Sequence, residues 1–328
     1  MENRYFTYEE FVVKQTEKTA LKRTALAIGL AILTYFVSSL AIGTILSYPA
    51  KLLLDVVPTV ELYDVVYECY IGLCYLIPMI LPLIPIALIV KIPLRVAIPM
   101  RRVPARVAIP GVMAAFGVSV VGIIIASVLL TFFQSMGFGY DVPMPAIPYT
   151  EIGRVMYLVI LSVLPSIFEE ILFRGYILQS LRRFGDFYAV LISALIFALF
   201  HGNFTQLPNA FVMGVAIAFL AVRTGSLIPG MILHFINNFA ATALDIYVLQ
   251  NANELVEVLV SLGYIAAYFI VGIIGIVVLL ATQNGFFTLK KSDSPLTVGE
   301  RVKAFFLQPV SLVGMLLMFA LCFTYFVQ

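Results

Sequence analysis

Long apolar runs, separated by short polar joints, recur along almost the whole chain from Leu26 to Val327. Of the 328 residues, 62% are hydrophobic and only 12% are charged, a balance that a water-soluble globule of this size does not show. A helix that crosses a bilayer needs about 20 predominantly apolar residues. By that measure the sequence predicts an all-α polytopic membrane protein with about eight to nine transmembrane helices. Because no long polar insert interrupts the runs, we expect a single transmembrane domain over residues 1–328.

Nine runs are candidates for these helices, and proline-rich joints separate them. They cover approximately residues 24–48, 70–90, 107–133, 153–178, 188–202, 207–222, 226–243, 259–281 and 307–327. The fifth and sixth runs are short, so we expect helices that are tilted, broken or buried within the protein away from lipid.

The basic residues indicate how the chain is oriented. With the N-terminus in the cytoplasm, seventeen of the twenty lysines and arginines fall in cytoplasmic segments, as the positive-inside rule requires. Residues 1–23 are then a cytoplasmic amphipathic lead-in, and the C-terminus lies outside. The opposite loops carry acidic residues: Asp55, Glu61, Asp64, Glu68, Asp141, Glu151, Asp245, Glu254 and Glu257. The net charge of +2, with no basic stripe, argues against nucleic acid as a partner.

The fourth apolar run is interrupted by Glu169, Glu170 and Arg174. Their spacing predicts different roles for the three side chains. Glu170 and Arg174 are four residues apart, with the acid nearer the N-terminus, which is the favourable order for a helical ion pair. Glu169 points about 100° away from Glu170 on a helix, so we expect it to be the unpaired carboxylate. A free carboxylate of this kind is a candidate general base.

The only two histidines of the chain also lie in apolar runs. His201 follows Phe197 by one helical turn, so the two should form an aromatic wall. His234 and Asn238 are four residues apart and should face one way. A helix rises about 1.5 Å per residue, so Glu169 and His201 should lie at a height of roughly 24 Å above the turn that joins their helices. By the same count, His234 should lie only roughly 12 Å above the turn before its helix. This mismatch in depth predicts either protruding turns or an irregular segment at 225–230.

Each of these residues also has a purely structural interpretation. A buried Glu–Arg pair is often only a packing device. A lone histidine or asparagine in a helix bundle often only hydrogen-bonds a neighbouring helix. Four such groups within about seventy residues, in a chain that is otherwise short of buried charge, favour a functional site.

Three motifs resemble those of one known family. They are Glu-Glu-x-x-x-Arg at 169–174, Phe-x-x-x-His at 197–201 and His-x-x-x-Asn at 234–238. In this order and spacing they resemble the CPBP family, the CAAX-protease and bacteriocin-processing (Abi) group of intramembrane endopeptidases that includes the Rce1-type prenyl-protein proteases. The resemblance covers about residues 150–245, the expected catalytic core helices.

The resemblance implies an all-helical membrane fold that encloses a polar catalytic cavity. It further implies that Glu169 and His201 activate the attacking water, and that His234 and Asn238 stabilise the oxyanion. Glu170 and Arg174, with Phe197, would shape the site. The expected activity is hydrolysis of a peptide bond in a membrane-associated or lipidated protein or peptide, by a glutamate-type mechanism without a covalent intermediate.

We expect no cofactor, although zinc stays an alternative because Glu169, His201 and His234 could supply three ligands. No His-Glu-x-x-His or Gly-x-Gly-Asp motif occurs, which disfavours the metalloprotease and aspartyl classes of intramembrane protease. Two other functions stay open: a non-proteolytic scaffold or bacteriocin-immunity-type protein that binds a peptide in the same cavity, and a proton-coupled transporter. The expected partners are a membrane-associated peptide or protein and the lipid bilayer, and the sequence leaves the oligomeric state undetermined.

Overall fold

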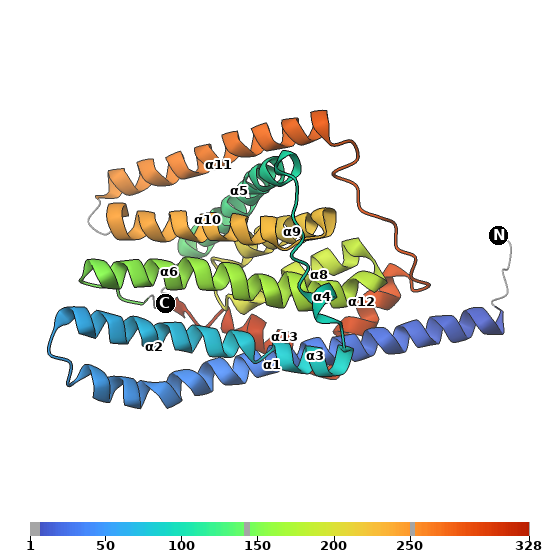
Figure 1. The fold of residues 1–328 in the computed structure, drawn as a ribbon, viewed down its shortest axis with the longest axis horizontal. Helices are drawn as coiled ribbons and strands as arrows, with labels where there is room; N and C mark the ends of the chain where they lie inside the picture. The colour runs from blue at the N-terminus through green and yellow to red at the C-terminus, as the bar shows by residue number, and fades with distance from the viewer. Residues whose placement is uncertain (1–6, 141–144, 250–252, 328) are drawn as a thin grey trace.

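The computed structural model describes residues 7–140, 145–249 and 253–327. In this part of the chain, long helices lie side by side in a bundle (Figure 1). Seven of the helices described there are long and apolar enough to cross a membrane, or eight if one bent pair counts as a single span. The all-α membrane class is therefore confirmed, with seven or eight spans among the described residues where the sequence predicted about eight to nine.

The first half of the chain forms α1 (Tyr8–Leu54), α2 (Val60–Ile80), α3 (Leu83–Val90), α4 (Leu94–Ala97), α5 (Ala105–Ser135) and β1 (Gly139–Tyr140). The middle forms α6 (Glu151–Glu169), the π-helix η1 (Glu170–Ile177), α7 (Leu178–Leu181), the 3₁₀ turn η2 (Arg182–Phe184), α8 (Asp186–Phe200) and α9 (Leu207–Thr224). The last part forms α10 (Ile228–Leu244), the π-helix η3 (Asp245–Leu249), α11 (Glu254–Thr282), α12 (Val298–Phe306), α13 (Pro309–Leu321) and β2 (Phe326–Val327).

The helix α2 begins earlier than the sequence predicted. We expected Asp64 and Glu68 in a loop, but both lie in α2 and are buried. The Oδ2 atom of Asp64 accepts hydrogen bonds of 2.7 Å from both the backbone N and the hydroxyl of Thr150, the N-cap residue of α6. Because this contact between helices satisfies the carboxylate, a polar residue is tolerated inside the helix. Asp141, which we placed in another outer loop, is outside the described residues.

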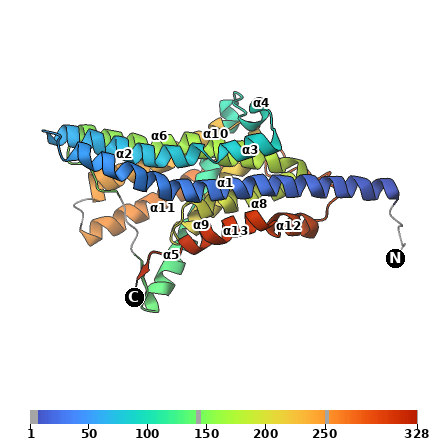
Figure 2. The ribbon, with the colours of Figure 1, turned by 90° about the horizontal axis from the view of Figure 1, so that it is seen from below.

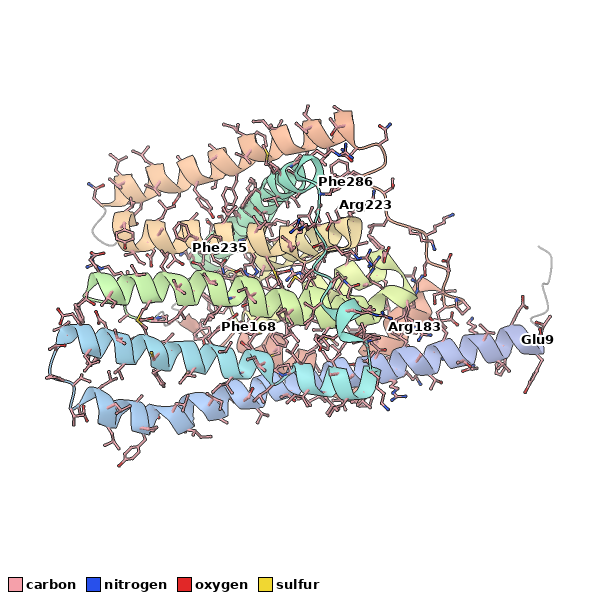
Figure 3. All side chains as sticks on the ribbon, viewed as in Figure 1. Glu9, Phe168, Arg183, Arg223, Phe235 and Phe286 are labelled. Carbon is pink, nitrogen blue, oxygen red and sulfur yellow. The ribbon has the colours of Figure 1, made fainter. Side chains whose placement is uncertain are left out.

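The expected N-terminal lead-in is not a separate element. From Tyr8 onward it forms the first turns of α1, and Thr7 caps this helix with Glu10 in a capping box. Residues 1–6 of the lead-in are outside the described residues. Figure 2 shows that the first turns of α1 extend beyond the rest of the bundle. Arg183 and Arg223 lie toward this same end of the molecule (Figure 3), in agreement with the clustering of basic residues that the sequence indicates.

The short fifth run forms α8, a largely buried helix of the middle part. Most of its 15 residues are buried, and Ser193, Ala194 and Ile196 are fully inaccessible to solvent. It packs against α9 and against the π-helix η1. Of the three alternatives for this run, burial within the protein agrees with the structure, and α8 delivers His201 to the interior.

The C-terminal end of the described chain folds back over the loop that follows His201. β2 pairs antiparallel with β1, and the two form a two-stranded ribbon. Next to this ribbon, the hydroxyl of Tyr140 accepts a 2.6 Å hydrogen bond from the backbone N of Phe204 and donates to Asn203 at 3.1 Å. The loop after α8 is therefore held from two distant parts of the sequence.

Candidate active site

The two glutamates lie where the α-helix α6 changes into the π-helix η1. Glu169 is the last residue of α6 and Glu170 is the first residue of η1. A π-helix uses i→i+5 hydrogen bonds, is rare, and often marks a functional site. The side chain of Ser193 donates a 2.8 Å hydrogen bond to the carbonyl of Phe173 within η1. The packing of α8 therefore helps to stabilise this unusual backbone next to the two carboxylates.

Glu170 forms the ion pair that its spacing predicts, and it also binds a histidine. Its Oε1 atom lies 3.1 Å from Nη1 of Arg174, and the side chains of both residues are fully buried. The same oxygen lies 3.0 Å from Nδ1 of His234. Arg174 also donates to the carbonyl of Gly214 at 3.1 Å, and its guanidinium lies 4.1 Å from the ring centre of Phe197. Glu170 thus contacts Arg174 in its own helical segment and His234 in α10. The contact with α10 was not predicted from the sequence.

Glu169 has a partner, contrary to our expectation of an unpaired carboxylate. Its Oε1 atom accepts a 2.8 Å hydrogen bond from the hydroxyl of Tyr75 in α2. Its Oε2 atom lies 3.8 Å from Nε2 of His234, too far for a direct hydrogen bond. The side chain of Glu169 is 13% exposed, whereas that of Glu170 is fully buried. Of the two carboxylates, Glu169 is therefore the one that a water molecule can reach.

Tyr75 is a site residue that the sequence analysis missed. It lies 94 positions before Glu169 in an aromatic-rich helix. Aromatic residues of this kind are typical of interfacial belts. No local pattern distinguishes Tyr75 from its neighbours Tyr67 and Tyr70, so only the packing of α2 against α6 identifies it.

His201 follows α8 directly and forms the expected wall with Phe197. The two rings meet edge to face with centroids 4.8 Å apart, and the Phe197 ring also lies 5.9 Å from the ring of His234. Nδ1 of His201 lies 2.9 Å from the carbonyl of Phe197. Because a carbonyl only accepts, Nδ1 carries the proton, and Nε2 of the neutral ring is an acceptor. No direct hydrogen bond joins His201 to Glu169 among the described residues.

Asn238 faces α6, as does His234, in line with their four-residue spacing. Its Nδ2 atom donates to the carbonyl of Leu161 at 3.3 Å, and its Oδ1 atom accepts from Asn237 at 3.1 Å. Asn237 in turn accepts a 3.2 Å hydrogen bond from Tyr268 of α11. Because an amide NH₂ has two donors, one N–H of Asn238 is left for another acceptor.

The predicted mismatch in depth between Glu169 and His234 does not persist in the folded chain. One reason is the π-helix, which fits more residues into each turn than an α-helix and so shortens the distance from Glu169 to the turn at Gly185. A second is the turn before α10, where Gly225 adopts a φ of +63° and the helix starts only at Ile228. The irregular segment that the sequence analysis proposed at 225–230 is thus present in part.

The site does not fit a metal ion. Within the described part of the chain, no three His, Cys, Asp or Glu side chains converge in a way that could hold one. Nδ1 of His201 is directed to a backbone carbonyl and Nδ1 of His234 to Glu170, so only Nε2 of either ring could bind a metal ion. Among the described residues, Glu169, His201 and His234 do not form the three-ligand cluster that the zinc alternative requires.

What these groups can do follows from their donors and acceptors. Glu169 and Nε2 of His201 are acceptors that could take a proton from water, and Asn238 can donate. Nε2 of His234 can donate when both of its ring nitrogens carry a proton. Acceptors for a nucleophilic water beside donors for an oxyanion are what amide hydrolysis requires.

Comparison with known proteins agrees with this chemistry. Residues 151–240 match the family model described as type II CAAX prenyl endopeptidase Rce1-like. The match spans α6 to α10 and contains both glutamates, both histidines and Asn238. No curated protein and no solved structure matches the chain. Residues 151–240 are thus similar to the Rce1-like family, within the CPBP group whose motifs the sequence resembles.

Proposed function

We propose that this protein is an intramembrane endopeptidase that hydrolyses a peptide bond in a membrane-associated or lipidated protein or peptide. The observation that carries the proposal is the convergence of Glu169 and Glu170 with His234 of α10, beside the Phe197 ring that also contacts His201. A family match over the same segment supports it. Burial of this many ionisable groups at membrane depth is costly, which favours a functional reason for their presence.

In the proposed reaction, Glu169 acts as the general base. Its accessible Oε2 and the acceptor Nε2 of His201 orient a water molecule, and Glu169 takes one of its protons as the water oxygen bonds to the carbonyl carbon of the substrate. The tetrahedral intermediate then breaks its C–N bond, and the proton on Glu169 passes to the leaving amine. Tyr75 keeps the carboxylate in place by its hydrogen bond to Oε1.

The developing negative charge on the substrate oxygen would be met by His234 and Asn238. A donor role for Nε2 of His234 requires a ring that is protonated on both nitrogens, with Nδ1–H donated to Glu170. Arg174 holds Glu170 in place through the buried ion pair, and Glu170 contacts Nδ1 of His234, so Arg174 and Glu170 are positioning residues for His234. Donors that are held in place before the reaction lower the barrier because they need no reorganisation.

We further propose that catalysis proceeds without a metal ion, since the ligand geometry above does not fit one. Purified protein that is treated with a chelator and then dialysed should keep its full activity, and elemental analysis should find less than one zinc per chain. Loss of activity on chelation, with recovery on addition of zinc, would contradict the proposed mechanism.

The proposed activity is tested by trapping the substrate. We expect a Glu169→Gln protein, expressed in its native membrane, to retain client proteins that mass spectrometry can identify. Wild-type protein in proteoliposomes should cleave these clients, and Glu169→Gln should cleave them at least roughly 100-fold more slowly, the smallest usual effect of losing a general base. Glu257→Gln, which changes an exposed carboxylate of α11, is the matched control and should cleave normally.

Other outcomes would identify a different function. If the captured proteins stay intact with wild-type protein, and the cellular phenotype survives Glu169→Gln, the protein is a non-proteolytic binding partner. If Glu169→Gln instead abolishes proton-coupled flux in proteoliposomes, the protein is a transporter.

A further inference from the structure

A cavity lies at the end of the bundle where the basic residues gather, between the start of α8, the loop residues 289–292 before α12, and α12 itself. Its volume is about 440 Å³. None of the catalytic candidates lines it, and His201 lies about 22 Å further along α8, from the 15 residues of that helix. The cavity is therefore separate from the candidate active site.

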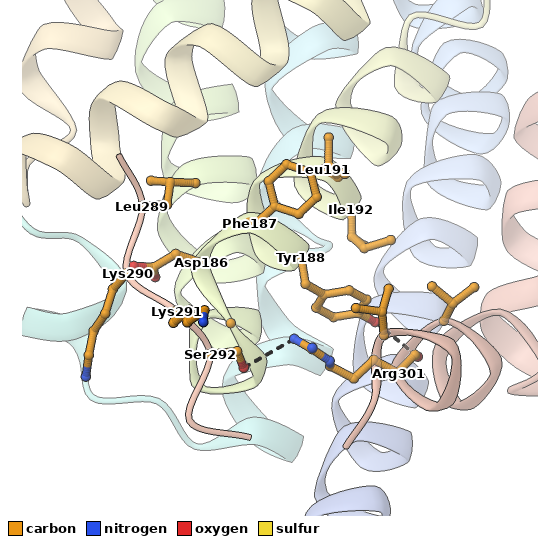
Figure 4. Close-up of a pocket in the computed structure, with 13 residues that line it drawn as sticks. Asp186, Phe187, Tyr188, Leu191, Ile192, Leu289, Lys290, Lys291, Ser292 and Arg301 are labelled. Atoms are coloured by element: carbon orange, nitrogen blue, oxygen red, sulfur yellow. Dashed lines mark hydrogen bonds between the residues drawn. The ribbon is translucent and has the colours of Figure 1, made fainter. Parts of the chain in front are cut away.

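The floor of the cavity is a buried and hydrogen-bonded structure. Arg301 is 8% exposed and donates to the hydroxyl of Ser292 at 3.2 Å (Figure 4). It also donates to the carbonyl of Phe184. The hydroxyl of Tyr188 donates to the carbonyl of Arg301 at 3.4 Å. These contacts join the segment 289–292 to α8 and α12, so the cavity is defined by fixed side chains.

The walls of the cavity are apolar and open to the surroundings. Phe187 is 64% exposed, Val298 is 66% exposed and Val302 is 39% exposed, and all three line the cavity together with Leu191. Exposed apolar side chains around a hollow of this size are suited to a hydrocarbon chain.

The rim of the cavity is cationic. This cavity and the adjoining depression are lined by five basic side chains, Arg182, Arg183, Lys290, Lys291 and Arg301, but by only two carboxylates, Asp186 and Asp293. Asp186 is paired with Arg182 at 2.7 Å.

The two lysines of this rim are the groups most available to a ligand. Asp293 lies 2.8 Å from Lys290, but that ion pair is fully at the surface, with side-chain exposures of 77% and 81%. The hydrogen bond from Lys290 to Asp293 raises the pKa of this lysine, which therefore stays charged. Lys291 makes no hydrogen bond or ion pair with any other described residue and is free to bind an anion.

The position of the cavity matches the surface of a bilayer. The axes of α12 and α13 differ by 77°, and α13 packs along α1, which is long enough to span the membrane. α12 therefore turns away from the membrane normal. It carries Val298 and Val302 on its exposed side and buries Ala304 and Phe305, as expected for a helix at the interface.

From these observations we infer that the cavity binds an anionic phospholipid. Its phosphate would lie against Lys290, Lys291 and Ser292, and one acyl chain would lie along Phe187, Leu191 and Val302. Basic clusters at the cytoplasmic side of membrane proteins bind anionic headgroups in this way, and each lysine contributes about 1 kcal/mol, or about fivefold in affinity.

The absence of tryptophan from the sequence permits a direct test. A Phe187→Trp protein carries a single fluorescent reporter on the cavity wall. In nanodiscs we expect brominated phosphatidylglycerol to quench this tryptophan more strongly than brominated phosphatidylcholine. Lys290→Gln with Lys291→Gln should weaken the preference by about 25-fold, following the fivefold value per lysine. Arg101→Gln with Arg102→Gln, which removes two exposed charges outside the cavity, should leave it unchanged.

A second variant distinguishes binding in the cavity from general attraction to the membrane. Val302→Trp, made in a protein that keeps Phe187, should fill the cavity without changing any charge. Native mass spectrometry should then find less phosphatidylglycerol bound. Soluble glycerol phosphate should not compete, because it lacks the acyl chain. The inference would be overturned if both lipids quenched the tryptophan equally, or if the preference survived the loss of both lysines. Displacement of the lipid by a soluble polyanion would also overturn it.

Discussion

At the scale of single residues, the site assigns different environments to two adjacent carboxylates. Glu169 is partly accessible and accepts from Tyr75, whereas Glu170 is fully buried between Arg174 and His234. A buried carboxylate that is paired on two sides is suited to hold other groups in position. An accessible carboxylate with one free oxygen is suited to accept a proton.

Removal of the Tyr75 hydroxyl tests whether this residue positions the base. A hydrogen bond to a charged group contributes about 1.5–3 kcal/mol, so Tyr75→Phe should lower kcat/KM by roughly 10- to 100-fold on a client found by trapping. Tyr63→Phe, another tyrosine of α2 without a bond to the site, is the control. The result would contradict the assignment if Tyr75→Phe cleaved at the wild-type rate, or if its loss of rate merely followed a loss of thermal stability.

The ion pair between Glu170 and Arg174 should be costly to break from one side. Arg174→Ala leaves a buried carboxylate without its main partner, and we expect a loss of about 3–5 kcal/mol in the free energy of unfolding. Glu170→Gln with Arg174→Met should recover most of that loss, because two neutral side chains need no counter-charge. Activity should stay low in the double variant because Nδ1 of His234 no longer faces a carboxylate.

Denaturation in detergent, followed by circular dichroism, measures both effects. The matched control is Lys290→Ala, which breaks the exposed pair with Asp293 and should leave the free energy of unfolding almost unchanged. Normal activity in the stabilised double variant would show that Glu170 does not position His234.

At the scale of single elements, the π-helix η1 depends on close contact with α4. A Cβ atom added to Gly175 would lie 2.6 Å from the carbonyl oxygen of Ala97, whose helix packs directly on η1. Glycine at this position therefore permits the approach of two backbones, and the contact supports the irregular backbone that carries Glu170.

A single added methyl group tests this contact. Gly175→Ala should lower the free energy of unfolding by about 1–3 kcal/mol, as overpacking does in well-packed interiors, and should reduce activity by disturbing η1. Gly263→Ala in α11 is the control, because a Cβ atom there meets nothing within 4 Å. It should stabilise the protein by about 0.5–1 kcal/mol, the usual gain from replacing a helical glycine. Equal effects of the two substitutions would contradict the proposed role of Gly175.

At the scale of the whole molecule, the basic residues predict which end faces the cytoplasm. Arg102 and Glu254 lie on opposite sides of the membrane if α5, which begins at Ala105, and α11 follow the positive-inside rule. We expect a membrane-impermeant thiol reagent, added to intact cells, to label Glu254→Cys but not Arg102→Cys in a chain whose three native cysteines are replaced. Permeabilised cells serve as the control and should allow both to be labelled. The opposite pattern in intact cells would show that the orientation is inverted.

Much of the architecture could be predicted because it depends on local properties of the chain. The apolar runs predicted the helices, since twenty apolar residues have few other stable arrangements in a membrane. The four-residue spacing predicted the pair of Glu170 and Arg174 and the common face of His234 and Asn238, because helical geometry fixes both. The start of α2 was placed too late because its buried Asp64 and Glu68 interrupt the apolar pattern.

By itself, then, the sequence determined the membrane class, most of the helices, and the candidate polar residues of the site other than Tyr75. Only the tertiary structure decided how these residues are partnered. It placed His234 between the two glutamates, brought Tyr75 to Glu169, and converted the segment after Glu169 into a π-helix. The physical reason is that periodicity fixes which face of a helix a residue occupies, whereas the neighbour of that face depends on helices far away in the sequence.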